Sequence, residues 1–200
     1  MVGGLSQLLK ISPHEFNERV TRKLLGAGRL APTFARDKAR EPKENGGVGL
    51  DEEAGDWSLK IEAPGLATRT MSIDEVKALP RVEMTTELMC IEGWSEVVHW
   101  TGTPLRHIAP PNAPEYVSLA TPDESYYVGL DLESALHPQT LLAWEMNGQP
   151  LSSEHGAPLR LVIPVKYGIK NIKRVGSIGF SPERPKDYWA ERGYDWYSGL

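Results

Sequence analysis

The chain has 200 residues, a net charge of -5 at pH 7, 40% hydrophobic residues and a single cysteine. This length and hydrophobic content suffice for one sizeable core. The acidic balance argues against general nucleic-acid binding, which normally requires a basic domain or stripe. One cysteine excludes an internal disulfide, a cysteine-based zinc finger and a self-ligated iron-sulfur cluster.

Membrane and targeting signals are absent from the sequence. No apolar stretch approaches the roughly 20 residues of a membrane-spanning helix, so we expect no membrane span. Residues 1–10 carry neither a twin-arginine pair nor the basic and apolar regions of a signal peptide. If the chain is the full product, this predicts a cytoplasmic protein; if an export signal is missing from the sequence, the prediction is periplasmic.

A helix is predicted near the N-terminus, where Ser12 and Glu15 have capping-box spacing and Pro13 suits the first helical position. Gly26 ends it, and its narrow apolar stripe consists of Phe16, Val20 and Leu24. We predict a helical segment at residues 1–30 that docks on a main domain at residues 31–200. An interaction arm is the alternative.

The rest of the chain is predicted to be rich in strands. Residues 32–53 carry proline, glycine and charge without periodicity, which predicts a solvated loop or one that wraps a site. Strands are predicted at 57–61, 82–90, 97–100, 116–120, 126–130, 141–146, 159–165 and 175–180. Short helices are predicted at 72–79, 103–110 and 131–136, and Asn147-Gly148 predicts a hairpin turn. We therefore expect a mixed, strand-rich α+β domain with short helices.

Cys90 ends the alternating strand that begins at Val82. A period of two places it on one face with Val82, Met84, Thr86 and Leu88, which predicts that the thiol points toward the interior. Glu92-Gly93 then breaks the strand. A lone buried cysteine is ordinarily inert packing, and a metal ligand is the alternative.

Positive charge is concentrated between Leu159 and Phe180, where no acidic residue occurs. The five basic residues are Arg160, Lys166, Lys170, Lys173 and Arg174. Glycines at 168 and 176 allow the backbone to approach a ligand closely. The run suits a bound phosphate or a similar anion, and a solvated basic loop is an equal alternative.

A cysteine hydrolase is a second hypothesis, because His99 follows Cys90 and either Asp123 or Asp131 would orient it. No local cation other than His99 would lower the pKa of the thiol, which disfavours this hypothesis. The five histidines also lack the spacing of a metal site built from histidines alone. Glu92 and Glu96 are expected to face solvent or to cap a turn.

Several motifs occur in the order found in a known family. They are Cys90-Ile91-Glu92-Gly93-Trp94, residues 98–105, Leu136-His137-Pro138 with residues 140–143, and residues 155–164 followed by Lys166-Tyr167-Gly168 and Lys173. Together they resemble the molybdopterin-binding domain of the sulfite oxidase superfamily, over residues 34–188. The nearest branch is the catalytic subunit of the bacterial periplasmic methionine sulfoxide reductase.

The resemblance implies molybdenum and molybdopterin as cofactors, with Cys90 as the protein's ligand to the metal. It also implies pterin- and phosphate-binding roles for Thr121, His155, Arg160, Gly168, Asn171, Ile172 and Lys173. Phe34 and Arg36 match the family's N-terminal cofactor-binding segment. Tyr167, or else Tyr126 or Tyr127, would donate a hydrogen bond to the oxo group of the metal, with core packing as the alternative for each ring.

The implied activity is two-electron oxygen-atom transfer by a molybdenum-molybdopterin oxidoreductase, with a separate electron-transfer protein as partner. No Arg or Lys lies between Arg81 and Arg106, and the pocket is expected to contain Trp94, His99 and Trp100. A small neutral sulfoxide or other oxo-substrate is therefore favoured over sulfite, unless Arg36 or Arg106 folds into the site. The alternatives are a sulfite oxidase-like dehydrogenase and a cofactor-free binding module on the same scaffold.

Overall fold

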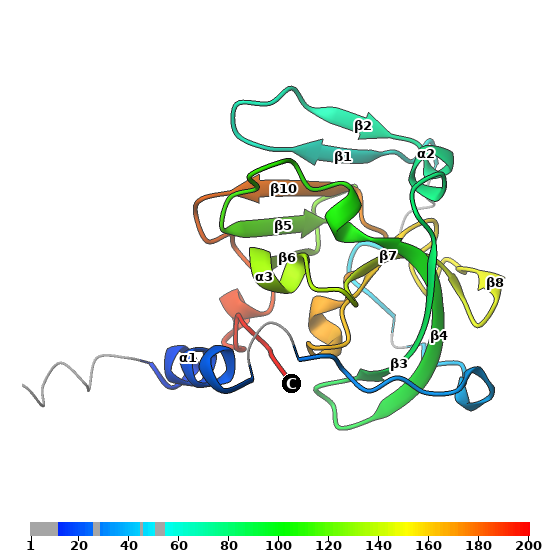
Figure 1. Cartoon of the computed structure of the whole chain (residues 1–200), viewed down its shortest axis with the longest axis horizontal. Coiled ribbons are helices and arrows are strands. Elements are labelled where there is room, and N and C mark those ends of the chain that lie inside the picture. The colour runs from blue at the N-terminus through cyan, green and yellow to red at the C-terminus, as the bar shows by residue number, and fades with distance from the viewer. Residues whose placement is uncertain (1–11, 26–28, 45, 51–54) are drawn as a thin grey trace, which may run out of the picture.

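A computed structural model describes residues 12–25, 29–44, 46–50 and 55–200. The strands of this part of the chain form two five-stranded sheets (Figure 1). The first has the order β2-β1-β10-β5-β6, in which β1 and β10 are parallel and the other neighbours antiparallel. Its strands are β1 (Leu59–Glu62), β2 (Arg69–Met71), β5 (Tyr116–Ala120), β6 (Tyr127–Asp131) and β10 (Ser177–Ser181).

The second sheet is antiparallel, with the order β3-β4-β7-β8, and β9 pairs with β7. Its strands are β3 (Val82–Met89), β4 (Ser95–Pro104), β7 (Leu141–Met146), β8 (Gln149–Pro150) and β9 (Arg160–Val162). The predicted turn at Asn147-Gly148 is confirmed, since both residues have positive φ angles, 53° and 80°. This mixed, strand-rich α+β architecture is the predicted one.

The two sheets pack face to face through one large apolar cluster that draws side chains from both, including Ile61, Leu119 and Ile178 from the first and Leu142 and Trp144 from the second. A smaller cluster covers the opposite face of the second sheet, and the alternate β7 residues Leu141 and Ala143 belong to it. Because both faces of β7 are buried, its sequence is a nearly continuous apolar run.

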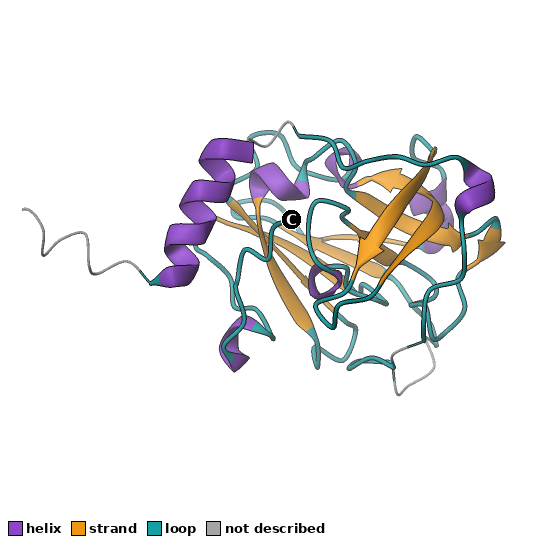
Figure 2. Cartoon of the chain, turned by 90° about the horizontal axis from the view of Figure 1, so that it is seen from below, coloured by secondary structure: helices purple, strands orange, loops and turns teal. Residues whose placement is uncertain are grey.

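The helices are short and lie around the strands (Figure 2). They are α1 (Pro13–Leu25), α2 (Ile73–Lys77) and α3 (Leu132–Ala135), with single 3-10 turns η2 (Arg36–Lys38), η3 (Leu105–His107), η4 (Gly168–Lys170) and η5 (Ala190–Arg192). The predicted capping boxes are present at Ser12/Glu15 and Ser72/Glu75. No helix among the described residues is long and apolar enough to cross a membrane.

Helix α1 lies against the main body, where Glu18 forms a 2.6 Å ion pair with Arg184. Its apolar stripe is only partly covered, since Phe16 is 60% exposed. The boundary between residues 30 and 31 stays a prediction, and the predicted helix end at Gly26 lies outside the described residues.

Two local predictions are wrong. Thr103 lies inside β4 and does not cap a helix; the following element is one 3-10 turn that begins after Pro104 and has no side-chain cap. In β3, Thr85 is buried on the face that alternation predicts to be exposed. It is buried because His99 of β4 lies opposite and its Nδ1 is 2.8 Å from the Thr85 hydroxyl.

Candidate active site

Cys90 begins the turn that joins β3 to β4. Its backbone N–H donates to Trp94 O at 2.9 Å, and Gly93 N–H donates to Cys90 O at 3.1 Å. Gly93 has a φ of 86°, a left-handed conformation that a residue with a Cβ rarely adopts. The turn therefore presents Cys90 at the rim of the sheet, and the thiol is partly exposed rather than buried in the core.

The Cys90 thiol opens into a cavity of about 340 Å³, which we call the thiol cavity. Six of the predicted site residues line it: Cys90, His155, Arg160, Gly168, Asn171 and Lys173. They come from the β3–β4 turn, from β9 and the segment before it, and from η4 and the residues after it. The fold thus brings together most of the motifs that are separate in the sequence.

Arg160 is the most deeply buried cation of the thiol cavity, at 3% exposure. Its guanidinium lies 4.8 Å from the centre of the Trp100 ring and donates to the backbone oxygens of His155 (3.1 Å) and Asn171 (3.4 Å). Its Nε has no hydrogen-bond partner. Burial lowers the pKa of Arg160 to about 10, so the group stays charged at neutral pH.

His155 and Lys173 stand beside Arg160 in this cavity. His155 is 1% exposed, and its Nε2 is buried without a hydrogen bond, 3.7 Å from Glu41 Oε1. Burial first, and then the positive charge of Arg160, lowers the pKa of both side chains, to about 8 for Lys173. Lys173 Nζ donates to Gly46 O at 2.7 Å. This cluster of N–H donors is arranged to receive an anion.

The Cys90 thiol has a carboxylate close by. Its Sγ lies 3.7 Å from Glu92 Oε2, which also accepts a 3.0 Å hydrogen bond from Trp94 Nε1. Burial raises the pKa of the Cys90 thiol, and the negative charge of Glu92 adds to the shift. A thiol with a raised pKa is a poor nucleophile in the absence of a metal.

The end of β3 separates the thiol cavity from a second cavity of about 430 Å³. Leu88 and Cys90 face the thiol cavity, whereas Glu87 and Met89 face the second one, as strand alternation requires. The end of β3 thus forms a wall between the two cavities. Gly168 packs closely against this wall, since a Cβ at this position would lie 3.3 Å from Met89 O.

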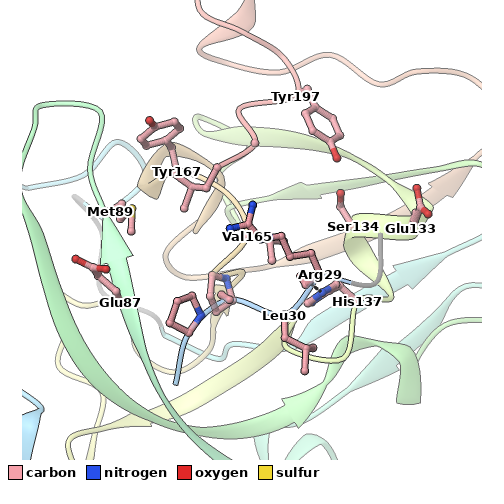
Figure 3. A pocket seen from close by; sticks show the side chains of 15 residues that line it. Arg29, Leu30, Glu87, Met89, Glu133, Ser134, His137, Val165, Tyr167 and Tyr197 are labelled. Atoms are coloured by element: carbon pink, nitrogen blue, oxygen red, sulfur yellow. Dashed lines mark hydrogen bonds between the residues drawn. The ribbon is translucent and has the colours of Figure 1, made fainter. Parts of the chain in front are cut away.

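Tyr167 faces the second cavity. Figure 3 shows it beside Met89 at one end, with Tyr197, Ser134 and Glu133 at the other. The predicted catalytic tyrosine is therefore on the other side of the wall from Cys90. Tyr126 lines the thiol cavity instead, but its hydroxyl already donates to Ile169 O at 2.6 Å. Tyr127 donates to Glu191.

The predicted basic run divides into two groups. Arg160 and Lys173 line the thiol cavity, whereas Lys166 and Lys170 are buried elsewhere against acidic partners. Lys166 Nζ lies 3.7 Å from Asp131 Oδ2, and Lys170 Nζ lies 2.5 Å from Asp187 Oδ2. Arg174 is also buried and donates to Ala157 O and Ser153 Oγ. The run is therefore not one anion-binding loop.

Four predicted cofactor residues do not line the thiol cavity. The backbone N–H of Phe34 donates to Thr85 O at the edge of β3. Arg36 Nη1 lies 4.0 Å from Glu83 Oε2. Thr121 is buried beneath Gly49, where a Cβ would come within 2.6 Å of the threonine methyl. The Ile172 side chain belongs to the main apolar cluster.

The structure does not support the cysteine hydrolase hypothesis, because His99 does not lie beside Cys90. In the β3–β4 ladder His99 pairs with Thr85, which lies five residues before Cys90. At about 3.3 Å per residue, His99 and Cys90 are therefore on the order of 16 Å apart along the strand. Asp123 accepts from Thr121 Oγ1, and Asp131 caps α3. His99 and Trp100 also do not line the thiol cavity; Trp94 does.

Sequence reasoning missed several lining residues, which lie outside the recognised motifs. They are Pro42, Lys43, the glycines 46 and 47, Val48, Trp189 and Tyr194. The loop before β1 and the segment after β10 contribute them, so the loop predicted to be solvated or to wrap a site does the latter. Nothing in their local sequence shows that they meet near Cys90.

Comparison with protein-family models identifies the domain. Residues 45–189 match the oxidoreductase molybdopterin binding domain. The chain belongs to this family. Within the sulfite oxidase group of folds, the structure is similar to the sulfane dehydrogenase SoxCD of Paracoccus pantotrophus, with a TM-score of 0.59 at 18% identity over 79% of this chain and 46% of that one.

Several curated relatives of the chain are named as protein-methionine-sulfoxide reductase subunits. A putative protein-methionine-sulfoxide reductase subunit YedZ1 of Azospira oryzae is 34% identical over 97% of this chain and 76% of its own length. The protein-methionine-sulfoxide reductase catalytic subunit MsrP of Xanthomonas campestris is 38% identical over 66% of this chain and 47% of its own. The chain spans about half the length of the MsrP relatives it matches. The comparisons do not support the predicted cytoplasmic location.

The residues of the thiol cavity fit the cofactor of this family. Two buried nitrogens, Arg160 Nε and His155 Nε2, have no hydrogen-bond partner and suit phosphate oxygens. Among the described residues no cluster of three or more His, Cys, Asp or Glu could hold a metal. A metal at Cys90 would therefore need further ligands from a cofactor, and soft sulfur donors suit a thiolate-bound transition metal.

Proposed function

We propose that this chain is the molybdopterin-binding catalytic part of an oxidoreductase that removes an oxygen atom from a neutral sulfoxide or similar oxo compound. The observation that carries this proposal is the shared cavity of Cys90, Arg160 and His155, in which a thiol faces buried donors without hydrogen-bond partners. The family match and the names of the relatives support it.

In this proposal each lining residue has a role. Cys90 supplies the thiolate to molybdenum, while His155, Arg160, Asn171 and Lys173 bind the pterin and its phosphate. Gly168 keeps the wall behind Cys90 thin. Thr121 supports the loop at Gly49 from below, and Ile172 fixes the cofactor loop to the core. We assign no cofactor-binding role to Phe34, Arg36 and Tyr167, because they do not line the thiol cavity.

The bound molybdenum cofactor would supply two-electron redox chemistry. In the overall reaction the sulfur–oxygen bond breaks, two electrons and two protons are taken up, and a sulfide and water leave. In this proposal the electrons come from a separate electron-transfer protein. The protein positions the cofactor and the substrate.

A neutral substrate is favoured over sulfite by the charge beside the thiol. Glu92 Oε2 lies 3.7 Å from Cys90 Sγ, so an anion at the metal would meet a carboxylate. Arg36 and Arg106, which would bind sulfite if they entered the site, do not line the cavity. The indole ring of Trp94 lines it instead.

The first test is metal and pterin analysis of protein made in a host that synthesises molybdopterin. We expect about one molybdenum per chain in the wild type, and in Cys90→Ser a soluble, folded protein that has lost metal-centred redox activity. Protein free of molybdenum and pterin would contradict the proposal and favour a cofactor-free binding module.

The second test concerns the substrate. With reduced dye as donor, we expect a sulfoxide to be reduced faster than sulfite is oxidised with oxidised dye, at equal enzyme and saturating substrate. Glu92→Gln should increase relative sulfite activity by at most about fivefold, because exposed charges interact weakly. A clear preference for sulfite in the wild type would show that the proposed substrate is wrong.

A further inference from the structure

The thiol cavity has an aromatic side formed by Trp94, Trp189 and Tyr194, which we call the aromatic wall. Trp94 belongs to the β3–β4 turn, whereas Trp189 and Tyr194 follow β10. The family match ends at residue 189, so Tyr194 lies outside it. The aromatic wall therefore combines Trp94 of the Cys90 motif with two residues of the C-terminal segment, of which Tyr194 lies beyond the family match.

The aromatic wall is held rigidly by its neighbours. Trp189 packs edge-on to Tyr194 and to Tyr188, with ring centres 5.1 Å and 5.3 Å away. Trp94 is fixed by its hydrogen bond to Glu92. Side chains locked in this way need little further ordering when a ligand binds.

The backbone at η5 sets the position of Tyr194. Asp187, itself 2% exposed, accepts hydrogen bonds from the N–H groups of Trp189 and Ala190. Gly193 then adopts a φ of 91°, and the chain turns back so that Tyr194 N–H donates to Trp189 O at 3.0 Å. Tyr194 remains 44% exposed. Its ring is thus both part of the cavity lining and open to solvent.

We propose that the aromatic wall is the subsite for the apolar substituent of the substrate, and that it selects sulfoxides with a large apolar or aromatic group over small ones such as dimethyl sulfoxide. This inference rests on the proposed function. Aromatic rings bury large apolar area and make favourable contacts with sulfur. An aryl or long alkyl group contacts the rings of Trp189 and Tyr194 while the sulfoxide oxygen points toward Cys90.

The experiment compares methyl p-tolyl sulfoxide with dimethyl sulfoxide, using reduced dye as donor. In Tyr194→Ala and Trp189→Ala we expect the ratio of kcat/KM for the aryl to the dimethyl substrate to fall at least tenfold, which corresponds to about 1.4 kcal/mol. Tyr194→Phe keeps the ring and should keep the wild-type ratio. Molybdenum and pterin content, measured in each variant, separates loss of the subsite from loss of cofactor.

A binding measurement without turnover separates this inference from the proposed function. Binding of methyl p-tolyl sulfone, followed by saturation-transfer NMR on the purified protein, should weaken in Tyr194→Ala and persist in Tyr194→Phe. If the wild type reduces sulfoxides but the ratio is unchanged in both alanine variants, the subsite is wrong and the function stands. If sulfone binding depends on Tyr194 but no sulfoxide is reduced, the function is wrong and the subsite stands.

Discussion

Lys170 and Lys173 stand three positions apart in the same basic run, yet their surroundings differ. Lys170 is fully buried, and its ammonium contacts Asp187 at 2.5 Å, Gly129 O at 3.0 Å and the Trp196 ring at 4.9 Å. Lys173 lines the thiol cavity beside Arg160 and donates to a backbone oxygen. Asp187, from a distant segment, makes Lys170 a structural residue, whereas Lys173 is assigned to a ligand in our proposal because it lines the thiol cavity.

The same division applies to the whole run. Lys166 contacts Asp131 and lies over the Tyr197 ring, so it belongs with Lys170. Arg160 donates to backbone oxygens and lines the thiol cavity, so it belongs with Lys173. We therefore expect substitutions in one group to change folding stability and substitutions in the other to change cofactor content.

The largest effect is expected for Lys170→Met. The change leaves the carboxylate of Asp187 buried without its partner, which should cost about 3–5 kcal/mol of unfolding free energy. Urea unfolding of the protein measures it. The matched control is Lys186→Met, because the Lys186 side chain is 84% exposed and its Nζ lies 3.9 Å from Glu191 Oε1. This change should alter stability by less than about 0.5 kcal/mol. Equal stability of both variants would show that the buried pair has no structural role.

A smaller effect, on cofactor affinity, is expected for Lys173→Ala and Arg160→Ala. Each removes a charge-assisted phosphate contact worth roughly 1.5 to 3 kcal/mol, so molybdopterin content should fall at limiting cofactor supply. Lys173→Arg keeps the charge and should retain most of the cofactor. Wild-type pterin content in both alanine variants would contradict the assignment of this group to the ligand.

A pH dependence should distinguish Lys166 further. Burial lowers its pKa to about 7, whereas an unfolded lysine titrates near pH 10.4. Between these values the unfolded chain binds more protons than the folded one, so the folded state gains stability as pH rises. We expect the unfolding free energy to rise between about pH 7 and about pH 9.5 more steeply in the wild type than in Lys166→Met. Parallel profiles would contradict the lowered pKa.

Local structure was largely predictable from the sequence, because it depends on nearby residues. The capping boxes at Ser12 and Ser72 and the Asn147-Gly148 turn follow from short-range spacing, and the structure confirms them. Thr103 was mispredicted because Thr103-Pro104 resembles a helix start, while β4 runs on through the pair to contact β7. Sheet pairing there overrode the local signal.

The site was predictable only where the family motifs carried it. Cys90, His155, Arg160 and Lys173 lie together in the thiol cavity, as the resemblance implied. The sequence could not show which cavity Tyr167 faces, because neighbouring residues face opposite cavities here. Tyr167 lines the second cavity, whereas Gly168 lines the thiol cavity. The aromatic wall could not be predicted from the sequence for another reason. The turn at Gly193 brings Tyr194 back beside Trp189, and no local motif indicates that both rings line the cavity.

The most direct test of the account is X-ray absorption at the molybdenum edge of the purified protein. If Cys90 is the protein's ligand in the thiol cavity, the metal in Cys90→Ser should show one sulfur neighbour fewer than in the wild type, in whatever fraction of chains retains cofactor. An unchanged sulfur count in the variant would contradict the central claim that the thiol at the end of β3 binds the metal.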